Sequence, residues 1–387
     1  MSDDFLPYNR PDLGPDEIEE VVDTLRSGWL TAGPKTKRFE AAFAEYLGAK
    51  GAAAVSSCTA GMALALEAAG IGPGDEVITS PFTFCATVNV IVHRGATPVL
   101  ADISPDDYNL DPSEVEKRIT PHTRALMPVH YAGQPCRMDE LREIARRNDL
   151  VVIEDAAHAV GARYRERPIG SEGIAVFSFY ATKNMTTGQG GMVTADDAEL
   201  LEKVRTLSLH GMSKGAWGRY EARGSWYYQV LAPGYNFAMT DVQAALGLHQ
   251  LRRLEGFLAR REEITRLYNE RLGALEELML PTARPEVRHV WHLYPLVLRP
   301  SPEGLTIDRD RFIEELRERG IGTSVHFIPI HYHPYYREAF GFRPGDYPRC
   351  EEVFEGLISL PNYPLMTDAD VERVAEAVCD IVAAHRR

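Results

Sequence analysis

The most constraining feature of this sequence is a series of short apolar segments, separated by helical stretches, between Gly51 and about Thr194. Several are apolar throughout, which is typical of strands buried on both faces of a mostly parallel sheet. Gly, Pro or Asp marks each junction, as in α/β proteins. The predicted strands are residues 52–56, 76–80, 98–103, 125–130, 150–155, 175–179 and 191–195. We therefore predict an open, doubly wound sheet, with crossover helices that include residues 62–70 and 138–148.

A long stretch without proline, about residues 240–275, is predicted to form one extended helix. Thr240 and Asp241 provide side chains that can cap its first turn. Such a helix would be roughly 50 Å long. We therefore expect a break near Gly247 or Gly256.

We interpret this helix as the connection between two domains. The first is a large domain, residues 1–250, which contains the predicted sheet. The second is a smaller C-terminal α+β domain, residues 251–387. Its expected elements are a strand within residues 291–298, a helix at residues 308–320 and a terminal helix from Thr367.

The composition excludes several classes of protein. The chain has 387 residues, of which 44% are hydrophobic and 25% charged, as in an ordinary globular protein. Its five cysteines include no CxxC pair, which argues against a disulfide framework or a zinc ribbon. The net charge of -14 opposes binding to nucleic acid. With neither a signal peptide nor an apolar run of roughly 18 residues, we expect a cytoplasmic protein without a membrane span.

Several common catalytic motifs are missing from the sequence, which contains no HExxH, Walker A or GxSxG motif. His331 and His333 are the pair most similar to metal ligands, and we expect them to share one face of a strand. No third ligand lies nearby in the sequence, so packing and hydrogen bonding explain them better than a metal does. We therefore predict no metal site.

Polar, charged and aromatic residues follow several of the predicted strands. Thr59 and Ala60 begin a helix directly after a strand, where free backbone N–H groups can bind an anion. Asp155 ends another strand, so its carboxylate would reach the carboxyl edge of the sheet. Lys183 lies in a polar, glycine-rich segment, and Phe84 offers a flat apolar ring. Taken singly, these residues have ordinary interpretations as helix caps, a surface lysine and a core ring.

Taken together, the same residues match the requirements of pyridoxal 5′-phosphate (PLP). This cofactor needs a phosphate site, an aromatic face, a lysine that forms a Schiff base, and an acid that keeps the ring nitrogen protonated. Only one connection and one strand separate Asp155 from Lys183, so both can flank one ring. The set therefore predicts a PLP enzyme.

The sequence resembles the fold-type-I, PLP-dependent sugar aminotransferases of the DegT/StrS type, from Asn9 to about Val374. The resemblance rests on SGWLTAGPKTKRFE, VSSCTAGMALAL, GDEVITSPFTFCATVN, EDAAHAVGARY, FSFYATKN, GYNFAMTDVQAALG and GIGTSVHF. It implies the PLP transferase fold of type I, with a strand at GIGTSVHF. Within the family, CTAGM, EDAAHAVG, KN and WHL are most similar to UDP-4-keto-sugar aminotransferases of the UDP-4-amino-4-deoxy-arabinose type.

The resemblance also implies roles for individual residues. The cofactor site would consist of the catalytic Lys183, Asp155 at the ring nitrogen, Phe84 on the ring face, His158 beside the ring, and Thr59, Ala60 and Ser178 at the phosphate. Asn236 would reach the phosphate of a neighbouring subunit, which makes the enzyme a homodimer with shared active sites. Trp29, Thr31, His326 and Tyr332 would line the entrance for the substrate.

The implied reaction transfers an amino group from glutamate to a nucleotide-linked keto-sugar, with a UDP-linked 4-keto-sugar favoured, and releases 2-oxoglutarate. Such a reaction serves amino-sugar and lipopolysaccharide or polysaccharide biosynthesis. Two alternatives are a PLP-dependent sugar dehydratase and a non-catalytic nucleotide-sugar sensor on the same fold. Lys183 argues against the dehydratases, which replace this lysine with histidine, and Lys183 with Asp155 argues against the sensor.

Overall fold

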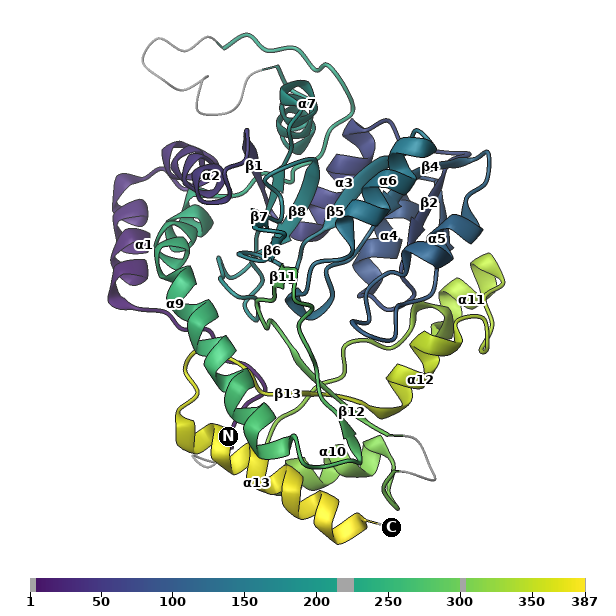
Figure 1. The fold of residues 1–387 in the computed structure, drawn as a ribbon. Coiled ribbons are helices and arrows are strands. Elements are labelled where there is room, and N and C mark those ends of the chain that lie inside the picture. The colour runs from purple at the N-terminus through teal and green to yellow at the C-terminus, as the bar shows by residue number, and fades with distance from the viewer. Residues whose placement is uncertain (1–4, 214–225, 300–303, 387) are drawn as a thin grey trace.

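The computed structural model describes residues 5–213, 226–299 and 304–386, and a seven-stranded sheet forms the centre of its N-terminal part (Figure 1). The strand order is β1-β9-β8-β5-β4-β2-β3. Its strands are β1 (Ala52–Val55), β2 (Glu76–Thr79), β3 (Thr97–Leu100), β4 (Thr123–Met127), β5 (Val151–Asp155), β8 (Ile174–Ser178) and β9 (Gly191–Thr194). Neighbouring strands are parallel except that β9 is antiparallel to β1 and β8. All seven predicted strands are confirmed.

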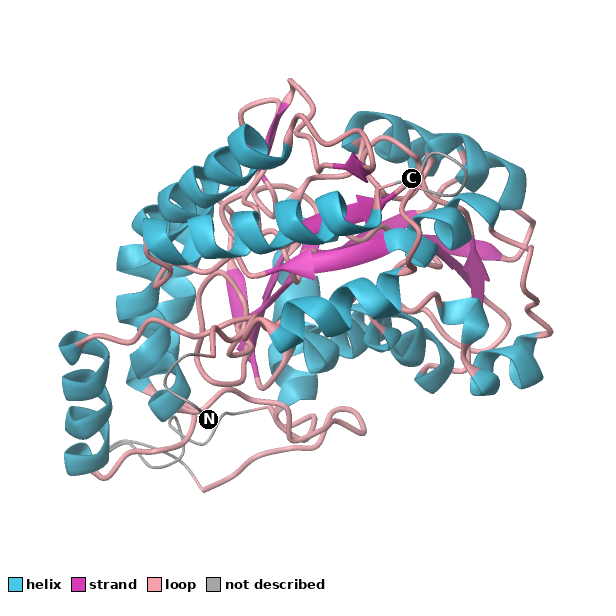
Figure 2. Ribbon diagram, turned by 90° about the horizontal axis from the view of Figure 1, so that it is seen from below, coloured by secondary structure: helices cyan, strands magenta, loops and turns pink. Residues whose placement is uncertain are grey.

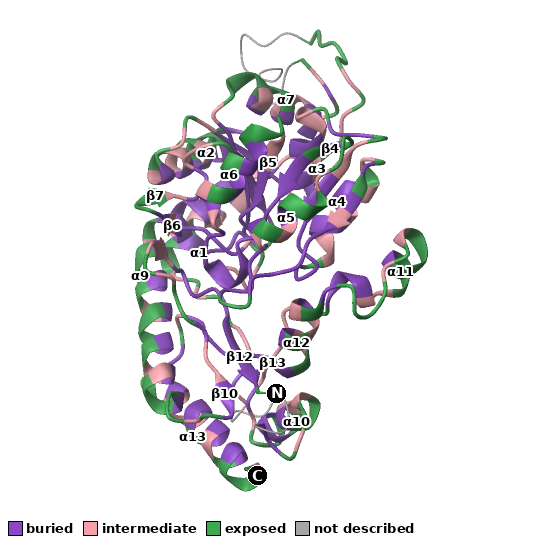
Figure 3. Cartoon of the chain, turned by 45° about the vertical axis from the view of Figure 1, so that its right-hand side comes forward, coloured by how far each residue is buried: buried purple, intermediate pink, exposed green. Residues whose placement is uncertain are grey.

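Helices cover both faces of this sheet (Figure 2). One face packs against α2 (Pro34–Leu47), α6 (Met138–Arg147) and α9 (Asp241–Leu272), and the other against α3 (Cys58–Ala68), α4 (Cys85–His93) and α7 (Ala198–Ser208). Successive residues of β1 enter opposite cores: Ala52 and Ala54 belong to the first, Ala53 and Val55 to the second. This double burial explains why the strands are apolar throughout. In Figure 3 the buried strands lie between helices, and each helix exposes only its outer side.

Helix α9 runs through 32 residues without interruption, so the expected break is wrong. At Gly247 an added β-carbon would lie 2.6 Å from the ring of Phe39, so this glycine allows α9 to pack closely on α2. Thr240 caps α9, because its Oγ1 accepts a hydrogen bond from the backbone N–H of Gln243 (3.2 Å). Asp241 instead caps α2, accepting from the backbone N–H of Gly33 (2.8 Å).

A second core lies at the C-terminal end of α9 (Figure 1). It is built on a three-stranded antiparallel sheet, β10-β12-β13, and on helices α10 and α13. These elements are β10 (Leu278–Met279), β12 (Tyr294–Leu298), β13 (Leu357–Leu360), α10 (Arg309–Glu318) and α13 (Asp368–His385). The strand and the two helices predicted for this part are thus confirmed. The division at residue 250 stays a prediction, and α9 runs across it.

The remaining elements are α1 (Pro15–Ser27), α5 (Pro112–Arg118), η1 (Tyr131–Gly133), η2 (Ile330–Tyr332), α11 (Pro334–Phe340), α12 (Pro348–Gly356), and a small sheet of β11 (Val287–Arg288), β6 (Arg163–Tyr164) and β7 (Arg167–Pro168).

Two expectations about the segment before α11 are wrong. GIGTSVHF is not a strand, because it pairs only at single positions, Ile321 with Leu6 and Ser324 with Ser359. His331 lies in the 3-10 helix η2 and not on a strand with His333. Pro329 and Pro334 flank these histidines, and proline cannot donate to a strand ladder.

Candidate active site

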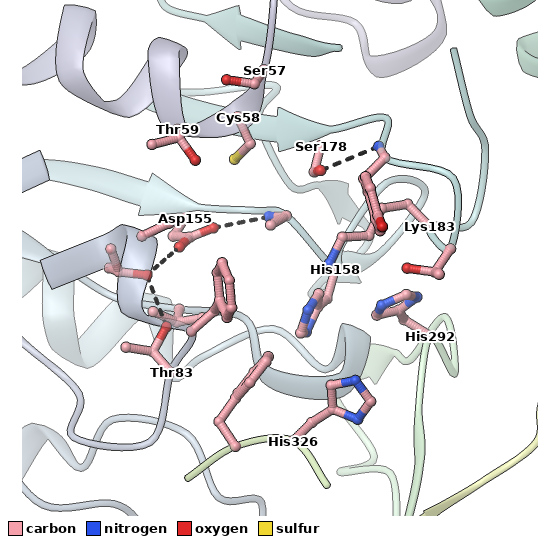
Figure 4. A pocket seen from close by; sticks show the side chains of 18 of the residues that line it. Ser57, Cys58, Thr59, Thr83, Asp155, His158, Ser178, Lys183, His292 and His326 are labelled. Atoms are coloured by element: carbon pink, nitrogen blue, oxygen red, sulfur yellow. Dashed lines mark hydrogen bonds between the residues drawn. The ribbon is translucent and has the colours of Figure 1, made fainter. Parts of the chain in front are cut away.

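A cavity of about 540 Å³ lies where the strands of the large sheet end (Figure 4). One side, which we call the sheet wall, consists of residues that follow β1, β2, β5 and β8. It includes Ser57, Cys58, Thr59, Thr83, Phe84, Thr87, Asp155, His158, Ser178 and Lys183. The other side, the opposite wall, consists of Tyr8, His292, Leu293, His326 and Phe327. Segments distant in the sequence therefore meet around one space.

Seven of the predicted site residues line this cavity, namely Thr59, Phe84, Asp155, His158, Ser178, Lys183 and His326. Five do not line it within the single chain. Ala60 donates its backbone N–H to Ser57 Oγ (3.1 Å), and Asn236 pairs with Leu209. Trp29 and Thr31 lie between α1 and α2, and the Tyr332 hydroxyl donates to Glu351 (3.1 Å). The cofactor and substrate roles of these five stay predictions.

Asp155 is held at the end of β5 as a buried carboxyl, only 4% exposed. Its Oδ2 accepts a hydrogen bond from Thr87 Oγ1 (2.8 Å), and its Oδ1 accepts one from the backbone N–H of Ala157 (3.1 Å). Burial raises the pKa of Asp155, whereas these hydrogen bonds and the charge of Lys183 lower it. A cationic partner in the cavity would therefore stabilise the ionised form of this carboxyl.

Lys183 lies in the loop after β8, which is fixed by a bond from its backbone N–H to the carbonyl of Tyr180 (2.9 Å). Burial lowers the pKa of Lys183 to about 8, against the raising effects of Cys58 and Asp155. An amine with such a pKa is readily available in its neutral form, as a nucleophile or a proton acceptor requires.

The first turn of α3 lies at the cavity, where Cys58 and Thr59 line it together with Ser178. Backbone N–H groups at the start of a helix have no carbonyl partner within the helix itself. Gly191, the first residue of β9, packs directly against this turn. An added β-carbon there would lie 2.6 Å from the carbonyl carbon of Ser57 and 2.7 Å from the nitrogen of Cys58. The glycine is required because the strand and the first turn of α3 approach so closely.

The opposite wall contains aromatic and histidine rings. His292 lies beside His158, with ring centroids 4.4 Å apart, and its Nδ1 pairs with the amide oxygen of Asn184 (3.1 Å). His326 Nδ1 pairs with Ser359 Oγ (2.9 Å). Burial lowers the pKa of all three histidines, that of His326 to about 4. The histidines are therefore neutral at neutral pH.

Sequence reasoning missed Tyr8, Thr87, His292 and Phe327. The segments TFCAT and WHL belonged to the family resemblance, so they contained a signal for Thr87 and His292. Phe327 ends GIGTSVHF, which also belonged to the resemblance, whereas Tyr8 lies outside every such segment and reaches the cavity through tertiary packing. His331, considered as a metal ligand, pairs through Nε2 with Glu351 (2.9 Å).

Comparison with known proteins places the chain in a family. A model of the DegT/DnrJ/EryC1/StrS aminotransferase family matches residues 11–379. The spore coat polysaccharide biosynthesis protein SpsC of Bacillus subtilis is 54% identical over 380 residues, which cover 98% of this chain and 97% of SpsC. The chain belongs to the DegT/DnrJ/EryC1/StrS aminotransferase family.

Solved structures agree with this placement. The PLP form of Spr1654 from Streptococcus pneumoniae superposes with a TM-score of 0.91 at 34% identity, covering 98% of this chain and 99% of that one. PseC of Helicobacter pylori, an aminotransferase involved in the biosynthesis of pseudoaminic acid, gives a TM-score of 0.90 at 30% identity over 98% of this chain and 100% of PseC. The chain is thus a PLP-dependent aminotransferase of a sugar aminotransferase family, with fold type I.

The residues present fit PLP. Asp155 offers a buried carboxyl for the ring nitrogen, and Phe84 lines the cavity while 58% exposed, so its ring face is available. His158 Nδ1 is buried beside the cavity without a hydrogen-bond partner in the part of the chain that the structure describes. The N-terminal turn of α3 provides donors for a phosphate.

When bound, PLP supplies an electron sink for reactions at the carbon that carries the transferred nitrogen. Lys183 Nζ can then accept and return the proton of that carbon, and Asp155 can hold the positive charge of the ring nitrogen.

Two further observations concern the described ranges only. Within them, no group of three or more His, Cys, Asp and Glu side chains is arranged to hold a metal ion. Among the helices of these ranges, none is long and apolar enough to cross a membrane.

Proposed function

We propose that the enzyme transfers the amino group of glutamate to C4 of a nucleotide-linked keto-sugar, with a UDP-linked 4-keto-sugar as the favoured acceptor. The observation that carries the proposal is the opposite wall, where Tyr8, His326 and Phe327 face the cofactor residues across the cavity. Neutral histidines and a tyrosine suit the hydroxyl groups of a sugar, and aromatic rings suit its apolar face.

The relatives support a role in building sugars for larger molecules. SpsC is a spore coat polysaccharide biosynthesis protein, and PseC acts in the biosynthesis of pseudoaminic acid. The sequence similarity to the UDP-4-amino-4-deoxy-arabinose type favours a UDP-linked acceptor and amination at C4.

Stopped-flow absorbance tests the acceptor. Enzyme loaded with glutamate and freed of 2-oxoglutarate is mixed with a panel of nucleotide-linked keto-sugars, free keto-sugars, pyruvate and oxaloacetate. We expect the cofactor to return to its PLP form fastest with a UDP-linked 4-keto-sugar. Equally fast return with pyruvate or oxaloacetate would indicate an ordinary amino-acid transaminase.

We also propose that two subunits share each active site, with Asn236 reaching the phosphate site of the partner. The proposal is supported by a nearby apolar segment at the surface, in which Trp226 is 86% exposed and Val230 65%. A second copy of the chain would cover such a segment.

A mixing experiment tests this sharing. Lys183→Ala and Asn236→Ala inactivate different halves of a shared site, so a mixed dimer has one site that carries both changes and one that carries neither. Mixing two inactive variants should therefore restore up to about a quarter of the wild-type activity. If the mixture stays inactive while subunits exchange, Asn236 acts within its own chain.

A further inference from the structure

Two buried threonines form a chain of hydroxyl groups that ends on Asp155. Thr87 Oγ1 lies 2.8 Å from Asp155 Oδ2, and Thr83 Oγ1 lies 2.8 Å from Thr87 Oγ1 (Figure 4). Both threonines are 1% exposed. They lie just before α4 and in its first turn, whereas Asp155 ends β5.

The direction of this chain follows from the number of hydrogens. A threonine hydroxyl has one proton to donate, and Thr87 donates it to the carboxylate. The contact between the two hydroxyls therefore requires Thr83 to donate to Thr87. Both O–H dipoles then point towards Asp155, and each bond polarises the next.

We propose that Thr83 and Thr87 are positioning residues that keep Asp155 ionised and aimed into the cavity, so that it can pair with the protonated ring nitrogen of PLP. The proposal rests on the predicted contact between Asp155 and that nitrogen. It is independent of which sugar the enzyme uses.

The chain is needed because the site otherwise works against a charged carboxylate. Burial favours the neutral form of Asp155 and raises its pKa. The groups that act on Asp155 electrostatically are Lys183 from the loop after β8, His130 after β4, and Cys58 in α3. A hydrogen bond from an uncharged hydroxyl to a carboxylate is charge-assisted and about twice as strong as a neutral one. Thr87 therefore lowers the pKa of Asp155, against the effect of burial.

Thr87→Val tests the proposal, because valine keeps the shape of threonine and removes only the hydroxyl. The loss leaves Asp155 Oδ2 buried with one partner fewer, so we expect PLP affinity to fall roughly 10- to 100-fold. We also expect a shift in the pH midpoint of the visible absorption of the bound cofactor. Thr87→Ser, which keeps the hydroxyl, should restore both values to within about threefold of wild type. Thr83→Val should shift the affinity and the pH midpoint in the same direction as Thr87→Val but by a smaller amount, since Thr83 acts through Thr87.

Thr79→Val is a matched control. Thr79 is fully buried on β2, and its Oγ1 donates to the backbone carbonyl of Met127 (2.7 Å) instead of to a carboxylate. This variant should lower the melting temperature without moving the absorption midpoint. If Thr87→Val does not fold, Thr87→Ala removes the same hydroxyl with less bulk.

Asp155→Asn separates two kinds of failure. If it moves the midpoint but Thr87→Val behaves like Thr79→Val, the threonine chain has no role and the proposal is wrong. If Asp155→Asn moves neither midpoint nor affinity, Asp155 does not pair with the ring, and the proposal is overturned together with its premise. In both cases the test of the sugar acceptor is unaffected.

Discussion

The two walls of the cavity differ in how their functional groups are held. On the sheet wall, Asp155, Thr87 and Ser57 take part in hydrogen bonds at the ends of strands and at the starts of helices, and Asp155 and Thr87 each have two side-chain hydrogen bonds. On the opposite wall, His292 and His326 are each held by a single side-chain partner, and Phe327 contributes only its ring. The difference suits two tasks, because a cofactor needs fixed charges, whereas a sugar needs a surface of the right shape.

The largest effect is expected where the sheet wall supplies the reacting amine. In the role that the sequence predicts for Lys183, Lys183→Ala removes both the covalent attachment of the cofactor and the group that moves the proton, so activity should fall roughly a thousandfold or more. Borohydride treatment followed by mass spectrometry measures the attachment. A cofactor still fixed to the variant by borohydride would show that another residue is the catalytic lysine.

The second-largest effect is expected at the first turn of α3, the part of the sheet wall that is predicted to bind the cofactor phosphate. Gly191→Ala places a β-carbon 2.6 Å from the carbonyl carbon of Ser57, and the first turn of α3 must shift to accept it. We expect PLP affinity to fall about tenfold or more, measured by titration of the cofactor-free enzyme. Gly256→Ala is the control, since its β-carbon meets nothing within 4 Å. In helix α9 this change should stabilise the protein by about 0.5–1 kcal/mol. Unchanged affinity in Gly191→Ala would mean that the turn does not hold the phosphate.

Burial of Lys183 should also make the stability of the cofactor-free enzyme depend on pH. The pKa of Lys183 falls from 10.5 to about 8 in the folded protein, so between these values the unfolded chain binds the extra proton. The free energy of unfolding therefore rises with pH across this window. The full destabilisation by the buried, charged amine, at most about 3 kcal/mol, applies below pH 8.

Lys183→Met removes this cost and should raise the melting temperature of the cofactor-free enzyme more at pH 7 than at pH 10. Lys37→Met, at an exposed position of α2, serves as the control. An equal gain at both pH values would show that the folded site does not destabilise the charged amine.

Sequence reasoning could find the sheet wall because its groups follow strands with a strong apolar signal. Asp155 and Thr59 come directly after such segments, and parallel topology gathers strand ends at one edge. The opposite wall has no comparable local signal. Tyr8 and Phe327 reach the cavity because β12, β13 and the N-terminal segment pack together, and no periodicity in the sequence encodes that contact.

Predictions from local sequence patterns also failed at positions where tertiary packing determines the structure. Gly247 and Gly256 suggested a break in α9, yet Gly247 serves the contact with Phe39 and the helix continues. Asp241 looked like a cap of its own helix but caps α2 across the fold. The partners of Gly247 and Asp241 are about 200 positions away in the sequence, where a local pattern does not reach.

The smallest effect is expected on the opposite wall, at Ser359. This serine is fully buried on β13, and its Oγ pairs with Nδ1 of His326 (2.9 Å), which fixes the histidine ring towards the proposed sugar site. Ser359→Ala removes this neutral hydrogen bond, worth about 1 kcal/mol, together with the side-chain hydrogen bond between Ser359 and Tyr8, and leaves the backbone bonds between Ser359 and Ser324 in place. We expect KM for the sugar to rise about fivefold, with little change in kcat or in the reaction with glutamate. Steady-state kinetics with each substrate in turn makes this measurement. A fall in kcat with unchanged KM would place His326 among the groups that act on the reacting atoms, and the division of labour between the two walls would then be wrong.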